Sequence, residues 1–171
     1  IDESGDDGLD KFREPGGRGG ASGWLVISAC LFRQIHSLDA VAWRDAISNK
    51  MPEKKSRALH FADLNHNQKL VAVQTIASKP LRAISVLAAK RPIPKGIYTE
   101  KNQLYFYMTR YLIERLSWLC RDLRPKVPEG DGRVAITFSR RGGMSYDAFR
   151  EYLKRLKAMG GNEVHWPVID I

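Results

Sequence analysis

The sequence has 171 residues, 43% of which are hydrophobic, so it has enough apolar side chains for a core and is not a disordered chain. No run approaches the roughly 18 uninterrupted apolar residues of a membrane span, and we expect a soluble, cytoplasmic protein without a membrane partner. The formal net charge of +9 favours a polyanionic partner, and we expect that partner to be nucleic acid.

The chain begins with features of a strand, a loop and a second strand. Ile1 is expected to end a strand that began further upstream, because no Met precedes it. Residues 4–23 are rich in Gly, Asp and Ser, a composition that predicts a mobile loop. Residues 24–32 are apolar with β-branched side chains and predict a buried strand.

Two helices are predicted next. Residues 37–48 have apolar side chains at helical spacing, and a second helix follows a cap at Asp63 or Asn65 and extends to about Ala77. The side chains expected to face inward are Leu38, Val41, Ala42, Ile47, Leu70, Val73, Ile76 and Ala77.

In the second half of the chain, predicted strands alternate with predicted helices. The clearest helix covers residues 100–121, where Leu104, Met108, Leu112, Leu116 and Leu119 recur every three or four residues. Strands are expected at 82–89, 133–138 and 163–169, and Ser145 is expected to cap a helix that extends to Ala158. This alternation predicts one α/β domain over residues 1–171, with both ends of the sequence cut. Cys30 and Cys120 lie in apolar segments and predict two buried free thiols.

The segment Asp2-Glu3-Ser4-Gly5-Asp6-Asp7 carries four carboxylates in six residues. Adjacent strand residues point to opposite faces, so Asp2 and Glu3 cannot both face one site. Mg²⁺ prefers oxygen ligands, typically one or two carboxylates together with substrate phosphates, and Asp2 at a strand end meets that need. The alternative is that Asp2 is a strand-terminating turn residue, and we interpret Asp6 and Asp7 as turn residues.

His60, Asp63 and His66 form a second set with a spacing of three residues. Imidazole and carboxylate groups bind transition metals, but a short strand at His60, a cap at Asp63 and a solvated His66 explain the same pattern.

Basic residues gather in the predicted connectors, where binding residues tend to lie. They are Lys50, Lys54, Lys55, Arg57, Lys90, Arg91, Lys95, Arg140 and Arg141. Arg140 and Arg141 precede a predicted helix start at Ser145, whose free N–H groups favour a phosphate. A solvated surface is the alternative for any single cation.

The motifs Ile1-Asp2-Glu3-Ser4-Gly5-Asp6, Leu59-His60-Phe61-Ala62-Asp63-Leu64 and the segments 107–116 and 137–146 resemble the DUF3800 family of domains of unknown function. The resemblance implies a ribonuclease H-like fold, a five-stranded mixed sheet flanked by helices, and acids that hold divalent metals. It matches Asp2 to the first-strand aspartate and Glu114, or else Glu100, to a helix glutamate. Ser139 departs from the acid expected at the fourth strand end, and the C-terminal helix of such folds lies beyond Ile171.

Together these observations predict a metal-dependent nucleic-acid-processing domain that hydrolyses phosphodiesters in RNA or DNA with Mg²⁺ or Mn²⁺. The expected catalytic residues are Asp2, Glu3, Glu114 and His60, with Asp2 as the main metal ligand and Glu3 as a secondary candidate for that role. The expected nucleic-acid contacts are Arg140, Arg141, Lys90 and Arg91. The alternative is a non-catalytic nucleic-acid- or partner-binding module that lost part of the acidic site, which Ser139 favours. A third possibility is an interaction protein whose basic charge is incidental.

Overall fold

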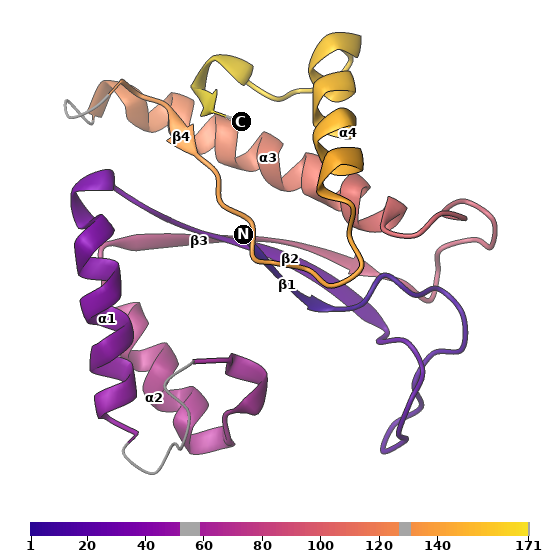
Figure 1. Ribbon diagram of the computed structural model, residues 1–171, viewed down its shortest axis with the longest axis horizontal. Coiled ribbons are helices and arrows are strands. Elements are labelled where there is room, and N and C mark those ends of the chain that lie inside the picture. Colours follow the sequence, from indigo (N-terminus) through magenta and orange to yellow (C-terminus); the bar gives the residue numbers. More distant parts are fainter. Residues whose placement is uncertain (52–58, 127–130, 171) are drawn as a thin grey trace. The chain divides into compact units, whose positions relative to one another are not determined.

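The computed structural model describes residues 1–51, 59–126 and 131–170 (Figure 1). Its helices and strands are β1 (Asp2–Gly5), β2 (Trp24–Phe32), α1 (Ser37–Asn49), α2 (His66–Ala77), β3 (Leu81–Ala89), α3 (Gln103–Leu123), β4 (Val134–Ala135), α4 (Tyr146–Met159) and β5 (Ile169–Asp170). Short 3-10 turns cover Gln34–His36, Phe61–Asp63, Arg124–Lys126 and Trp166–Val168. No helix within the described ranges is both long and apolar enough to cross a membrane.

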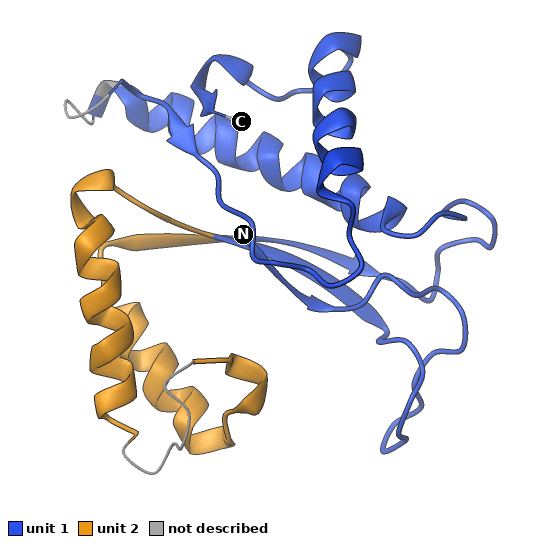
Figure 2. Cartoon of the chain, viewed as in Figure 1, with its two compact units in different colours: residues 1–29, 84–171 blue, residues 30–83 orange. Residues whose placement is uncertain are grey.

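The chain divides into two compact units (Figure 2). Unit 1 comprises Ile1–Ala29 and Ile84–Ile171, and unit 2 comprises Cys30–Ala83. A division into compact units does not decide how many parts fold independently, so the single domain over residues 1–171 stays a prediction.

The predicted five-stranded, ribonuclease H-like mixed sheet is wrong. The strands form a three-stranded antiparallel sheet in the order β1-β2-β3 and a separate two-stranded parallel sheet, β4-β5. The strands expected at 133–138 and 163–169 are reduced to two residues each. Pro167 explains part of this difference, because proline has no N–H to donate to a strand ladder and favours the 3-10 turn at Trp166–Val168.

The segment after β4 continues alongside the residue before β1. The Ile1 amino group donates to the Thr137 carbonyl at 2.7 Å, and the Ser139 N–H donates to the Ile1 carbonyl at 2.8 Å. Ile1 thus bonds to the two residues on either side of Phe138, which is the hydrogen-bond pattern of parallel strands. These two bonds bring the residues after Ser139 close to the acidic start of β1.

The core of unit 1 lies between β2 and the two helices α3 and α4, which occupy the same side of the three-stranded sheet in Figure 1. The helix predicted at 100–121 is confirmed as α3, and Leu104, Met108, Leu112 and Leu116 are buried as expected, whereas Leu119 is half-buried. The helix predicted after Ser145 is confirmed as α4, with the Ser145 hydroxyl accepting from the Ala148 N–H at 3.2 Å. Phe149 and Leu153 of α4 complete the core.

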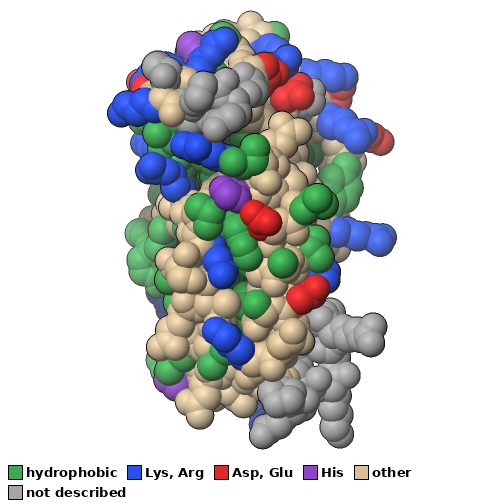
Figure 3. Space-filling view, turned by 90° about the vertical axis from the view of Figure 1, so that its left-hand side faces the viewer, with side chains coloured by type: hydrophobic (Ala, Val, Ile, Leu, Met, Phe, Trp, Pro, Cys, Tyr) green, Lys and Arg blue, Asp and Glu red, His purple; other side chains and the backbone are tan. Residues whose placement is uncertain are grey.

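Unit 2 contains α1 and α2, and the inward faces predicted for both helices are wrong. In α1, Ile47 is buried as expected, but Leu38, Val41 and Ala42 are exposed. In α2, Leu70, Val73 and Ile76 are exposed, whereas Ala72 and Thr75 are buried. A small cluster of Ile47, Met51, Leu64 and Ala72 forms the core of this unit instead. Hydrophobic side chains are accordingly visible among Lys and Arg side chains on the surface in Figure 3.

Candidate functional site around Arg141

β1 carries the two acids that the sequence motif singled out. Asp2 is exposed, whereas the neighbouring Glu3 side chain is only 16% exposed. This difference follows from strand geometry, because consecutive side chains point to opposite faces of a sheet. Glu3 faces a cluster of polar side chains from three other segments, and Asp2 faces away from that cluster into solvent.

Arg141 is the centre of this cluster. Its Nη1 donates to Glu3 Oε1 and its Nη2 donates to Asp7 Oδ1, both at 2.9 Å. Its Nε donates to Asn102 Oδ1 at 3.3 Å, and its guanidinium carbon lies 4.7 Å from the centre of the Tyr105 ring. The Arg141 side chain is 11% exposed. A guanidinium that binds two carboxylates and stacks on an aromatic ring in this way is a fixed structural cation rather than a free phosphate ligand.

Local backbone geometry assembles the cluster. Asn102, directly before α3, has a left-handed φ of 64°, a conformation that asparagine tolerates better than most residues. Its N–H donates to Asp7 Oδ2 at 2.7 Å, and its side-chain amide donates to the Gly143 carbonyl at 3.3 Å. The Tyr146 hydroxyl, at the start of α4, accepts from the Arg141 N–H at 2.8 Å. The starts of β1, α3 and α4 are therefore joined through one polar network.

Tyr105 forms the apolar side of the cluster and is almost fully buried. Burial raises the pKa of its phenol to about 12, with a further increase from the negative charge of Glu3 and an opposing effect of Arg141. The phenol therefore stays neutral at physiological pH and cannot act as a base.

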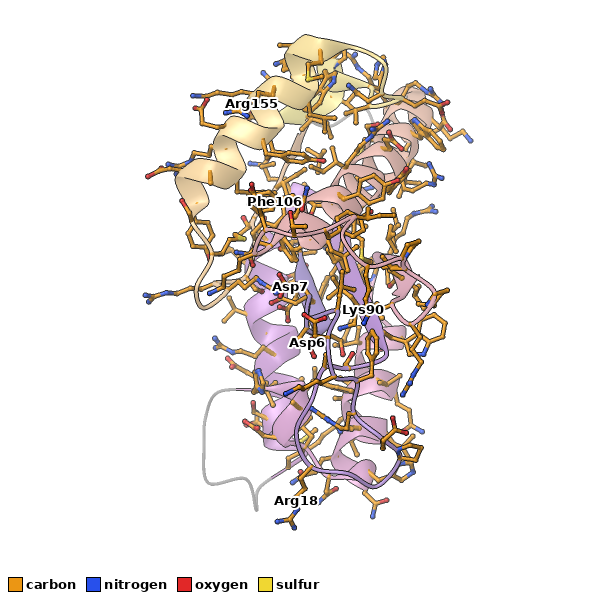
Figure 4. The ribbon with its side chains drawn as sticks, turned by 90° about the vertical axis from the view of Figure 1, so that its right-hand side faces the viewer. Asp6, Asp7, Arg18, Lys90, Phe106 and Arg155 are labelled. Atoms are coloured by element: carbon orange, nitrogen blue, oxygen red, sulfur yellow. The ribbon has the colours of Figure 1, made fainter. Side chains whose placement is uncertain are left out.

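Lys90 lies in a second ion pair, which anchors the loop after β1 (Figure 4). The Lys90 side chain is fully buried, and its Nζ donates to the Asp6 and Gly8 carbonyls at 2.7 Å and to Asp6 Oδ1 at 3.0 Å. A phosphate cannot reach an ammonium in this position. We therefore remove Lys90 from the nucleic-acid contacts expected from the sequence.

The Asp6 carboxylate also accepts from the Gly8 and Ser22 N–H groups, at 2.9 and 2.8 Å. Burial disfavours its ionised form, but these hydrogen bonds and Lys90 outweigh burial and lower the pKa of Asp6. The resulting stabilisation is present above the ordinary pKa of aspartate and is lost as pH falls through the lowered value. Asp6 thus joins the two ends of the loop. Arg18, in the middle of the loop, lies well below Asp6 in the view of Figure 4. The mobility of residues 4–23 stays a prediction.

The other predicted cations differ in their surroundings. Arg91 and Arg140 are exposed, and Arg91 donates to the Arg13 carbonyl at 3.3 Å and lies 5.2 Å from the centre of the Phe12 ring. Lys54, Lys55 and Arg57 lie outside the described residues.

Glu114 lies in the middle of α3 and is buried in a network of its own. Its Oε1 accepts from Arg110 Nε at 3.2 Å and from the Glu163 N–H at 3.3 Å, and Oε2 lies 3.9 Å from Arg115 Nη1. These contacts join α3 to the segment before β5. None of these contacts within the described ranges joins Glu114 to Asp2 or Glu3. Glu100, the other glutamate matched by the resemblance, is exposed and lies before the first residue of α3.

His60 lies in unit 2, where its Nδ1 is 3.5 Å from Asp63 Oδ2, and both side chains are largely exposed.

Asn65, rather than Asp63, caps α2: its side chain accepts from the Gln68 N–H, and the Gln68 side chain accepts from the Asn65 N–H, both at 3.0 Å. Cys30 is also exposed, contrary to the buried thiol that we expected, and Cys120 is half-buried.

The divalent metal ion expected from the sequence stays a prediction, because one or two carboxylates together with substrate phosphates are enough to hold Mg²⁺. Within residues 1–51, 59–126 and 131–170, no group of three or more His, Cys, Asp or Glu side chains is placed to hold one. The Glu3 and Asp7 carboxylates both accept from Arg141, which occupies them with an internal cation. The network can hold the starts of β1, α3 and α4 together, and we assign no chemical step to a metal in it.

No protein-family model, curated protein or solved structure matches this chain. The resemblance to the DUF3800 family therefore stays a prediction, and the function has to be inferred from the residues themselves.

Proposed function

We propose that this chain binds nucleic acid and does not itself cleave it. The position of Arg141 favours binding over cleavage. Its guanidinium donates to both Glu3 and Asp7 at 2.9 Å. Hydrolysis with Mg²⁺ or Mn²⁺ needs carboxylates that are free to bind the metal. Here Glu3 of the first motif and the following Asp7 bind Arg141, and Asp6 binds Lys90, so that among these acids Asp2 is the one left exposed.

The positive charge of unit 1 lies on its surface and supports the binding part of the proposal. The exposed cations include Arg115, Arg124, Lys126, Arg133, Arg140, Arg150, Lys154, Arg155 and Lys157. Lys and Arg side chains gather at the upper end of the face shown in Figure 3. Some of these cations have carboxylate partners, but exposed ion pairs contribute at most about 1 kcal/mol, so a phosphate can replace the partner.

The motif resemblance bears on the partner alone, because the phosphodiester chemistry that it implies would also involve a nucleic acid. We therefore also propose a relationship to the DUF3800 family through the segment Ile1–Asp6 and the other motifs. The two free cysteines support a reducing compartment, and we place the protein in the cytoplasm.

Metal-dependent phosphodiester hydrolysis is the second candidate function. One observation favours it: the Asp2 carboxylate is exposed on β1, beside Glu3, where the resemblance expects the first metal ligand. Loss of cleavage in Asp2→Asn would support this candidate, and the assay is described in the Discussion.

Binding of nucleic acid is expected to weaken steeply with salt. A protein that neutralises Z phosphates shows a slope of log affinity against log salt of about −0.9Z on duplex DNA and about −0.7Z on single strands. We expect a slope steeper than about −2, corresponding to three or more phosphates. Fluorescence anisotropy with labelled oligonucleotides over a series of salt concentrations measures this slope. The absence of binding at low salt, or an affinity that salt does not change, would contradict the proposal.

A further inference from the structure

Unit 1 contains a pocket that shares no lining residue with the Arg141 cluster. It has a volume of about 310 Å³ and is lined by Arg133, Lys157, Trp166, Pro167 and Ile169. These residues come from the position directly before β4, the end of α4, the 3-10 turn Trp166–Val168 and the start of β5. The pocket is open rather than enclosed, and its volume lies at the small end of the range for ligand sites.

The pocket combines an aromatic ring, an apolar floor and two cations. The Trp166 ring is half-buried, and its Nε1 donates to Asn162 Oδ1 at 3.2 Å, which fixes the orientation of the ring. Lys157 Nζ lies 5.9 Å from the centre of that ring. Ile169 is buried and contributes apolar surface.

The second cation, Arg133, pairs with Asp170, with 2.9 Å between Arg133 Nη2 and Asp170 Oδ1. About half of each side chain is exposed, so this pair is weak and an incoming anion can compete for the guanidinium. Lys157 and Arg133 together therefore offer two donors to an anionic group beside the ring.

We propose that this pocket binds one nucleotide of a single-stranded nucleic acid, with the base stacked on Trp166 and the adjacent phosphates bound by Lys157 and Arg133. The inference rests on the proposed function and specifies which form of nucleic acid is bound. Proteins bind single strands through aromatic rings that stack bases and through cations that follow the backbone. A base inside a duplex is covered on both faces by its neighbours, so it cannot stack on the ring.

The first experiment separates stacking from charge. Trp166→Leu removes the aromatic ring, Trp166→Phe keeps one, and Trp24→Leu changes an exposed Trp of unit 1 outside the pocket. Binding is measured by anisotropy on a labelled oligothymidylate, on an abasic strand of the same length and on a duplex. We expect Trp166→Leu to bind oligothymidylate at least about fivefold more weakly with an unchanged salt slope, because stacking on an aromatic ring contributes about 1–3 kcal/mol per base. The abasic strand and the duplex should be unaffected, Trp166→Phe should retain most of the affinity, and Trp24→Leu should match the wild type.

The second experiment tests the phosphate contact. Lys157→Gln should weaken binding of oligothymidylate and make its salt slope shallower by about 0.7, the contribution of one phosphate on a single strand. Lys11→Gln is the control, because Lys11 is an exposed lysine of unit 1 that lies in the loop after β1 and does not line the pocket. Its salt slope should equal that of the wild type.

The outcomes distinguish this inference from the function on which it rests. Steep, salt-dependent binding by the wild type that neither Trp166→Leu nor Lys157→Gln changes would overturn the pocket and leave the proposed function standing. Equal weakening of oligothymidylate and abasic binding by Trp166→Leu would overturn the stacking. Wild-type protein that binds no nucleic acid would overturn the proposed function itself. If circular dichroism shows that Trp166→Leu does not fold, the comparison of Lys157→Gln with Lys11→Gln decides whether the pocket binds a phosphate.

Discussion

Arg141→Met is expected to lower the free energy of unfolding by about 3 kcal/mol. Methionine keeps an unbranched apolar stem over Tyr105 but removes the guanidinium, so the largely buried Glu3 and Asp7 carboxylates lose their shared cation. Breaking a buried ion pair by removing one partner costs about 3–5 kcal/mol, and the partial exposure of these carboxylates, 16% and 21%, places the loss at the lower end. Urea unfolding followed by circular dichroism measures the loss.

Two further variants test whether the loss arises from the ion pair. Arg140→Met removes a neighbouring exposed cation and should change the free energy of unfolding by no more than about 0.5 kcal/mol. The triple variant Glu3→Gln, Asp7→Asn, Arg141→Met leaves no unpaired charge and should recover part of the lost stability, because neutral partners cost less to bury. Equal stabilities of Arg141→Met and Arg140→Met would contradict the network described above.

Leu112→Ala is expected to cost about 2–5 kcal/mol, the range for deleting a large aliphatic side chain from a packed core. Leu112 is fully buried in the middle of α3, within the cluster that also contains Leu25, Leu104 and Met108. Alanine maintains helix propensity, so the loss measures packing rather than helix formation. The control is Leu87→Ala, because Leu87 lies in unit 1 but is 61% exposed, and its replacement should be nearly neutral. A Leu112→Ala protein as stable as Leu87→Ala would show that a different face of α3 is buried.

The contrast between α3 and α2 shows when the hydrophobic pattern identifies the buried face. α3 packs against both β2 and α4, and this wide contact requires a broad apolar face, which repeats from Leu104 to Leu116. α2 is shorter and packs within a small cluster through Ala72. A small side chain such as Ala72 allows the helix to pack closely against its neighbours, so the buried face of α2 is not its most hydrophobic face. The spacing of the large apolar residues therefore predicts the wrong face.

The edges of the fold were harder to predict than its centre. β2 and β3 are long, apolar segments, and both were expected within one residue of their observed bounds. β4 and β5 have two residues each, and their pairing of Val134 with Ile169 depends on how the chain folds back over 35 residues. Local patterns carry no information about such a contact, and the apolar runs at 133–138 and 163–169 therefore predict longer strands than the structure contains.

The candidate site was predicted in part. Glu3 and Arg141 were both singled out, but as a metal ligand and a phosphate contact, whereas they bind each other across 138 positions of the sequence. Asp7 was interpreted as a turn residue, and Asn102 was not considered. An asparagine directly before a strongly periodic helix is a signal that could have identified Asn102 as a capping position. No local signal marks the pairing of Asp7 with Arg141.

The measurement that tests the account most directly is cleavage of nucleic acid by the wild-type full-length protein. Labelled single- and double-stranded RNA and DNA are incubated with the protein and Mg²⁺, Mn²⁺ or EDTA, and Asp2→Asn is run in parallel with its melting temperature recorded. We expect salt-dependent binding without any cleavage that EDTA abolishes, because Arg141 neutralises Glu3 and Asp7. Cleavage by the wild type that requires Mg²⁺ or Mn²⁺, and that disappears in a folded Asp2→Asn variant, would contradict the account.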